Sequence, residues 1–77
     1  MKIQQFKYNY RGHEVWAPPG CQWIAVNKGG TIAGFISEPQ IEEDMWMSTS
    51  SRGGLLGFAD DFEDWRDSLE YVGDQHE

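Results

Sequence analysis

The chain has 77 residues and a formal net charge of −7, with 13 acidic against 6 basic side chains. A chain of this length forms one small domain, 1–77, with a thin core. Its single cysteine, Cys21, excludes an intramolecular disulfide, and no Cys/His set has zinc spacing, so the four Trp, three Tyr and four Phe side chains have to supply most of the packing.

The charge is unevenly distributed along the chain. Residues 38–77 carry twelve acidic side chains against Arg52 and Arg66, whereas residues 1–37 carry four basic side chains against Glu14 alone. Nucleic-acid binding requires clustered Lys and Arg, so this balance argues against nucleic acid as a direct partner. It is compatible with a basic protein partner, whereas the usual interpretation of acidic stretches is a solvated surface that aids solubility.

No targeting or membrane segment is visible in the sequence. Residues 1–7 lack the apolar run of a signal peptide, and no stretch approaches the length of a membrane span. We therefore expect a cytoplasmic protein with no membrane partner.

The first of two hairpins expected within 2–37 begins near the N-terminus. Residues 2–10 alternate, with Phe6, Tyr8 and Tyr10 on one face of a strand. Gly12 suits the left-handed position of a three-residue loop that begins at Tyr10, and 13–17 return as the second strand. The Pro18-Pro19-Gly20 tripeptide then ends the pairing.

The second hairpin is expected from strands 21–26 and 31–37, joined by a turn that contains Gly29 and Gly30. Apolar residues fall on both faces of these strands, which is typical of the centre of a covered sheet. One short helix covers only one face. We therefore expect an apolar sheet face that remains for a second copy or for a foreign partner.

Residues 38–59 are expected to be rich in loops, with a polar, glycine-containing loop over 48–54. Two short apolar pieces, Met45–Met47 and 55–59, could each extend the sheet.

The C-terminal segment is expected to be a helix over 61–72. Phe62, Trp65, Leu69 and Val72 recur at helical spacing, Asp60 resembles an N-cap, and Gly73 follows as a C-terminal stop. The alternative is a short strand over 69–72. The fold class expected from all these elements is α+β, a small antiparallel sheet of two or more hairpins with one C-terminal helix.

No catalytic constellation occurs in the sequence. His13 is expected at a hairpin base and His76 in the C-terminal tail, the Ser48–Ser51 run lacks a nucleophile-elbow pattern, and the glycine clusters lack a following Lys-Ser/Thr. The carboxylates of 42–44 and 60–61 lack EF-hand spacing. We expect no enzyme activity, no cofactor and no metal site.

Two motifs carry a family resemblance. The run Trp23-x-Ala25-x-Asn27-x-x-Gly30-x-Ile32-x-x-Phe35-x-x-x-Pro39 and the ending Asp64-Trp65-x-x-Ser68-Leu69 are similar to small uncharacterised proteins encoded by bacteriophages and prophages. The resemblance spans about Tyr10 to Leu69 and consists of strand, turn and packing residues. It implies phage origin and action inside the cytoplasm of a bacterial host, and it supplies no catalytic residue.

The function expected from these observations is binding. On a helix, Asp60, Asp64 and Asp67 would form one acidic ridge, with Asp61 and Glu63 beside it. Such a ridge could occupy a basic groove in a host nucleic-acid-binding or anti-phage defence protein, and so inhibit or modulate it by nucleic-acid mimicry.

Two other contacts stay open at this point. Trp46, within the Met45–Met47 triplet, is the second candidate for a partner contact because a central tryptophan is a common binding hot spot. The alternative function is a homodimer or larger assembly of phage origin that uses the apolar hairpin 21–37.

Overall fold

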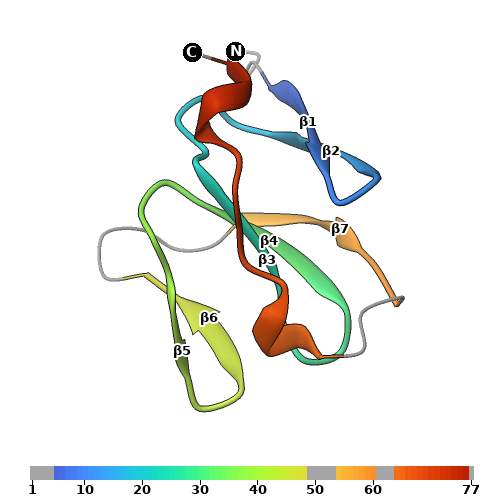
Figure 1. Ribbon diagram of the computed structural model, residues 1–77, viewed down its shortest axis with the longest axis vertical. Coiled ribbons are helices and arrows are strands. Elements are labelled where there is room, and N and C mark those ends of the chain that lie inside the picture. Colours follow the sequence, from blue (N-terminus) through green and yellow to red (C-terminus); the bar gives the residue numbers. More distant parts are fainter. Residues whose placement is uncertain (1–4, 49–53, 61–63, 77) are drawn as a thin grey trace.

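The computed structural model describes residues 5–48, 54–60 and 64–76, and the backbone there is all-β with two short 3₁₀ turns (Figure 1). The expected α+β fold class is therefore wrong. The first hairpin is confirmed: β1 (Phe6–Tyr10) pairs antiparallel with β2 (His13–Ala17). Tyr10 lies opposite His13, so the loop has two residues rather than three, and both Arg11 and Gly12 have positive φ as the tightest hairpin turns require.

The second hairpin forms the centre of a four-stranded sheet. β3 (Trp23–Val26) and β4 (Thr31–Phe35) pair antiparallel, and the strand order is β7-β4-β3-β8. The two edge strands are β7 (Gly54–Phe58) and β8 (Glu70–Tyr71). The apolar piece over 55–59 thus extends the sheet.

The two faces of the central hairpin bury different clusters. Ile24, Val26 and Ile32 pack on one face with the inward side of hairpin β1–β2. On the other face Ala25, Ala33 and Phe35 pack with Trp46. Trp46 belongs to the hairpin formed by β5 (Gln40–Glu42) and β6 (Met45–Met47).

Both faces of 21–37 are therefore covered within the chain. The expectation that this hairpin leaves a free apolar face is corrected, because hairpin β5–β6 supplies the second cover through Trp46.

The expected C-terminal helix is absent. Of residues 61–72, the structure describes 64–72, and these form a 3₁₀ turn η1 (Trp65–Asp67) followed by β8, with a second turn η2 (Gly73–His76) beyond. The alternative, a short strand within 69–72, is confirmed by β8, which pairs antiparallel with β3.

Contacts with β3 and with Gln22 before it explain why residues 64–72 do not form the expected helix. The hydroxyl of Ser68, which is fully buried, accepts a hydrogen bond from the Val26 amide at 2.8 Å and lies within hydrogen-bonding distance of the Val26 and Trp65 carbonyls. Further on, the Val72 amide donates to the Gln22 carbonyl at 2.7 Å. A helix would withdraw these groups from the sheet, so tertiary pairing outweighs the local capping signals.

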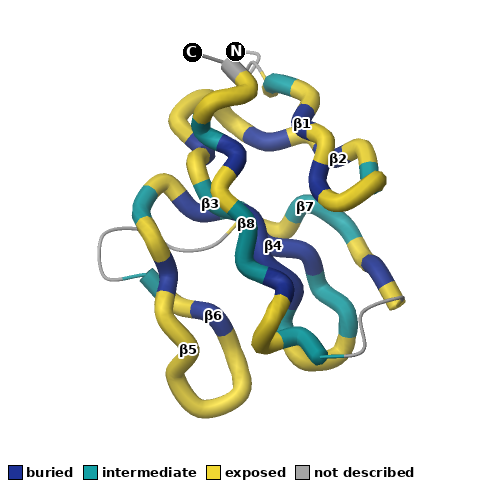
Figure 2. The backbone as a smooth tube through the Cα atoms, in the orientation of Figure 1, coloured by how far each residue is buried: buried dark blue, intermediate teal, exposed yellow. Residues whose placement is uncertain are grey.

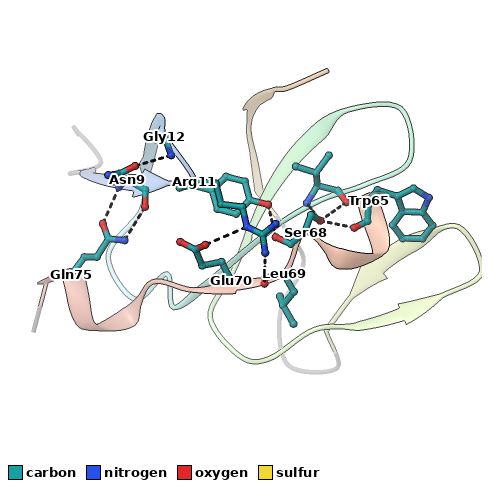
Figure 3. Close-up of polar contacts among 10 residues, drawn as sticks. Asn9, Arg11, Gly12, Trp65, Ser68, Leu69, Glu70 and Gln75 are labelled. Carbon is teal, nitrogen blue, oxygen red and sulfur yellow. Dashed lines mark hydrogen bonds and ion pairs between the residues drawn. The ribbon is translucent and has the colours of Figure 1, made fainter. Parts of the chain in front are cut away.

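The same segment also fastens hairpin β1–β2 to the sheet (Figure 3). The Gln75 side chain accepts from the Asn9 amide and donates to the Asn9 carbonyl, each at 2.9 Å. Arg11 donates to the Glu70 carboxylate and to the Leu69 carbonyl. The C-terminal segment thereby joins the two layers of the fold.

Candidate protein-interaction site

Three of the five predicted acidic residues lie in the described part of the chain, and no helix aligns those three. Asp60 is exposed after β7, Asp64 is half-buried before η1, and Asp67 is exposed at its end. Asp61 and Glu63 lie outside the described residues. Without a helix the spacing of these residues no longer aligns their carboxylates, so the helical basis of the ridge is wrong.

Asp64 is engaged within the chain. Its carboxylate caps η1 by accepting from the Arg66 backbone amide at 3.1 Å, and it accepts from Arg66 Nε at 3.1 Å. These hydrogen bonds from Arg66 hold the pKa of Asp64 below its usual value. Asp60 and Asp67 have no ion-pair partner within the described part of the chain.

Trp46 is a structural anchor in this fold, with only 7% of its surface exposed. Its backbone amide donates to Asn27 Oδ1 at 2.7 Å, and its indole Nε1 donates to the Trp65 carbonyl at 3.2 Å. The flanking Met45 and Met47 are 46% and 44% exposed, because alternate residues of a strand point to opposite faces. The surface of this triplet is therefore methionine rather than tryptophan.

Hairpin β5–β6 carries an acidic turn beside these methionines. Glu42, Glu43 and Asp44 are all exposed, and Glu43 adopts a positive φ of 57° in the turn. The Asp44 carboxylate oxygen Oδ2 lies 4.0 Å from Nζ of Lys28 in the β3–β4 turn. Figure 2 shows the whole tip of this hairpin exposed.

These acidic groups gather at one end of the molecule. The tip of hairpin β5–β6, the β3–β4 turn and η1 lie at the end opposite the chain termini (Figure 1), and the ion pair of Lys28 and the bond between Trp46 and Trp65 join them. We call this the acidic end. Its described carboxylates are Glu42, Glu43, Asp44, Asp60, Asp64 and Asp67.

All Lys and Arg side chains that the structure describes form ion pairs with carboxylates. Each of the four lies within ion-pair distance of a carboxylate, in the pairs Lys7–Glu14, Arg11–Glu70, Lys28–Asp44 and Arg66–Asp64. Six carboxylates have no ion-pair partner among the residues that the structure describes: Glu38, Glu42, Glu43, Asp60, Asp67 and Asp74. The charged side chains without an ion-pair partner in the described residues are therefore carboxylates, and four of these six lie at the acidic end.

A pocket of about 270 Å³ opens at the acidic end. Its lining comes from the end of β3 and the β3–β4 turn (Val26, Asn27, Gly29 and Gly30) and from the segments around β7 and η1 (Ala59, Asp60 and Trp65). From the sequence, Trp65 is predicted on the apolar stripe of a C-terminal helix, and Asn27 is given no role at this site. Trp46, 19 residues from each, bonds to both Asn27 and Trp65, so no local pattern signals that they meet.

A second, smaller hollow of about 130 Å³ lies over Cys21, between the Pro18-Pro19 turn and Leu56. The Cys21 thiol is buried, and that burial raises its pKa, although hydrogen bonds with the backbone of Phe35 and Trp23 act in the opposite direction. The thiol therefore stays protonated at neutral pH, which makes it a poor nucleophile.

Strand β7 leaves two large side chains in solvent. Leu55 is 65% exposed and Phe58 is 74% exposed. They lie opposite Ala33 and Thr31 of β4, on the face that Trp46 covers further along the sheet. The sheet thus has an uncovered apolar margin at β7.

No protein-family model matches the sequence, and no curated protein and no solved structure matches it either. Within 5–48, 54–60 and 64–76, no group of three or more His, Cys, Asp or Glu side chains is placed to hold a metal ion. No helix among these residues is long and apolar enough to cross a membrane.

Proposed function

We propose that this protein binds a basic surface of another protein through its acidic end, and that it acts by occupying that surface rather than by catalysis. The observation that carries the proposal is the charge balance: every described cation is paired, whereas Glu42, Glu43, Asp60 and Asp67 are unpaired at one end of the fold. A concentrated negative surface attracts a basic partner and selects it over neutral ones.

Methionines at the same end supply apolar contact. Met45 and Met47 are half-exposed beside the acidic turn, and methionine adapts its shape to different partner surfaces. Carboxylates around an apolar centre give a contact in which charge steers the encounter and buried area supplies affinity. This combination supports a protein partner more than a simple solubilising surface.

The partner that fits is a host nucleic-acid-binding or anti-phage defence protein, because basic grooves for phosphates are common in such proteins. Binding there would inhibit or modulate the host protein by nucleic-acid mimicry, in the cytoplasm of a bacterial host. The phage resemblance stays a prediction and supports only the choice of host.

The test uses a bacterial DNA-binding protein captured from lysate at low salt and then purified. We expect the complex to dissociate at high salt and to be displaced by double-stranded DNA. The double variant E42Q/E43Q should weaken binding, while the control E38Q/D74N, which removes the same amount of charge elsewhere, should not. Equal loss in both variants, or binding that DNA does not affect, contradicts the proposal.

Self-association is a second candidate function, favoured by the exposure of Leu55 and Phe58 on β7. This margin replaces the hairpin 21–37 as the expected contact between copies, and it would serve a structural or assembly role. Light scattering at micromolar concentration tests it. A dimer that returns to the monomer mass in L55S/F58S supports self-association, whereas a monomeric parent protein rules it out at that concentration.

A further inference from the structure

We propose that the pocket between the β3–β4 turn and η1 binds an arginine side chain of the basic partner. The inference rests on the proposed function and deepens it, because it names the group that the acidic end recognises. The residues that carry it are Asp60 and Trp65, with Val26 and Ala59 as apolar lining.

Two residues of the pocket, Asp60 and Trp65, suit a guanidinium group. The Asp60 carboxylate has no ion-pair partner within the described residues, so it is available for a cation from outside. Trp65, an aromatic residue, lines the same pocket. A guanidinium is planar, so it can stack on a ring and donate to a carboxylate at the same time, whereas an ammonium group is a compact point charge.

The chain itself shows Trp65 in contact with this group. The guanidinium carbon of Arg66 lies 5.9 Å from the centroid of the Trp65 ring, and Arg66 Nε lies 3.1 Å from the Asp64 carboxylate. The chain therefore already has one guanidinium that is near both the Trp65 ring and a carboxylate. The proposed arginine would repeat this arrangement in the pocket with Asp60 as its carboxylate.

The walls of the pocket are held before any ligand arrives. The Gly30 amide donates to the Asn27 carbonyl at 2.9 Å, and the Ala59 amide donates to the Gly30 carbonyl at 2.8 Å. The Trp65 carbonyl accepts the Trp46 indole. A site with walls in place loses less conformational freedom on binding.

The experiment is an NMR titration of the full chain with two blocked tripeptides, Gly-Arg-Gly and Gly-citrulline-Gly. Citrulline keeps the shape of arginine and removes its charge. We expect Gly-Arg-Gly to shift the amides of Gly29 and Gly30 and the indole N–H of Trp65, and Gly-citrulline-Gly to leave them in place. The variant D60N should weaken this binding about threefold, the size expected for one partly exposed ion pair.

D74N is the matched control, because Asp74 is an exposed carboxylate on η2, outside the acidic end, and does not line the pocket. It should bind Gly-Arg-Gly as the parent does. Equal shifts with citrulline, equal weakening in D60N and D74N, or equal affinity for Gly-Lys-Gly would each overturn the arginine assignment. The proposed function fails separately, in the salt and DNA tests of the E42Q/E43Q variant.

Discussion

The side-chain hydroxyl of Tyr10 donates a hydrogen bond to the backbone carbonyl of Ser68, which lies 58 residues further along the chain, and both residues are buried. Tyr10 belongs to hairpin β1–β2, and Ser68 lies between η1 and β8. Ser68 also bonds through its own hydroxyl to the backbone of Val26 in β3. One serine therefore connects the N-terminal hairpin, the central sheet and the C-terminal segment, and this position explains why 64–72 runs along the sheet.

Substituting Ser68 tests this connection. In S68A the Val26 amide loses its acceptor in a fully buried position, so we expect a loss of about 1–3 kcal/mol in the free energy of unfolding. Y10F removes the hydrogen bond to the Ser68 carbonyl and should cost about 1 kcal/mol. Urea unfolding followed by tryptophan fluorescence measures both, and an S68A variant as stable as the parent would show that the connection is dispensable.

Truncating Trp46 should unfold the domain rather than remove a surface contact. The side chain is buried against Ala25, Ala33 and Phe35, so W46A leaves a core cavity, and we expect a loss of about 3–5 kcal/mol. The neighbouring half-exposed variants M45A and M47A should change stability by no more than about 0.5 kcal/mol. Thermal unfolding checks this order, and a folded W46A of parental stability contradicts the burial of the ring.

Gly30 and Gly29 form a matched pair in the β3–β4 turn. Both have positive φ, 97° and 101°, but a Cβ on Gly30 would lie 2.6 Å from the Ala59 carbonyl oxygen, whereas one on Gly29 would meet nothing within 4 Å. G29A should therefore cost about 1 kcal/mol for backbone strain alone. G30A should cost more, because β7 and the β3–β4 turn have to separate. Chemical denaturation of the two variants measures the difference, and equal stability would show that the turn moves freely.

The buried thiol of Cys21 should react slowly. Burial raises its pKa, so little thiolate exists at neutral pH, and we expect a maleimide reagent to modify the native protein far more slowly than the urea-unfolded protein. The raised pKa also makes the free energy of unfolding depend on pH. The stabilising contribution of the protonated Cys21 thiol is complete below the ordinary pKa of a thiol, and it is lost as the pH rises through the higher pKa of the folded state.

Tyr8 should add to this alkaline loss, because burial and the nearby Cys21 raise the pKa of its phenol as well. Urea midpoints measured from neutral to alkaline pH test the sign, with C21A as the variant in which the decline should be smaller. A midpoint that rises with pH, or rapid modification of the native thiol, would contradict the raised pKa.

Local patterns by themselves determined the two N-terminal hairpins. Alternation of apolar and polar residues places Tyr8 and Tyr10 on one face, and glycines with positive φ mark both turns, so sequence neighbours carry the information. The acidic balance of the second half follows from composition alone.

Only the tertiary structure decided the C-terminal segment and the site. The stripe from Phe62 to Val72 and the Asp60 cap are local helix signals. Glu70–Tyr71 nevertheless pair with β3, and Ser68 and Val72 bond to Val26 and Gln22, because buried polar groups there find partners across the sheet. The burial of Trp46 and the meeting of Asp60 with Trp65 in one pocket depend on the same long-range contacts. Such contacts join segments far apart in the chain, so periodicity and spacing contain no signal for them.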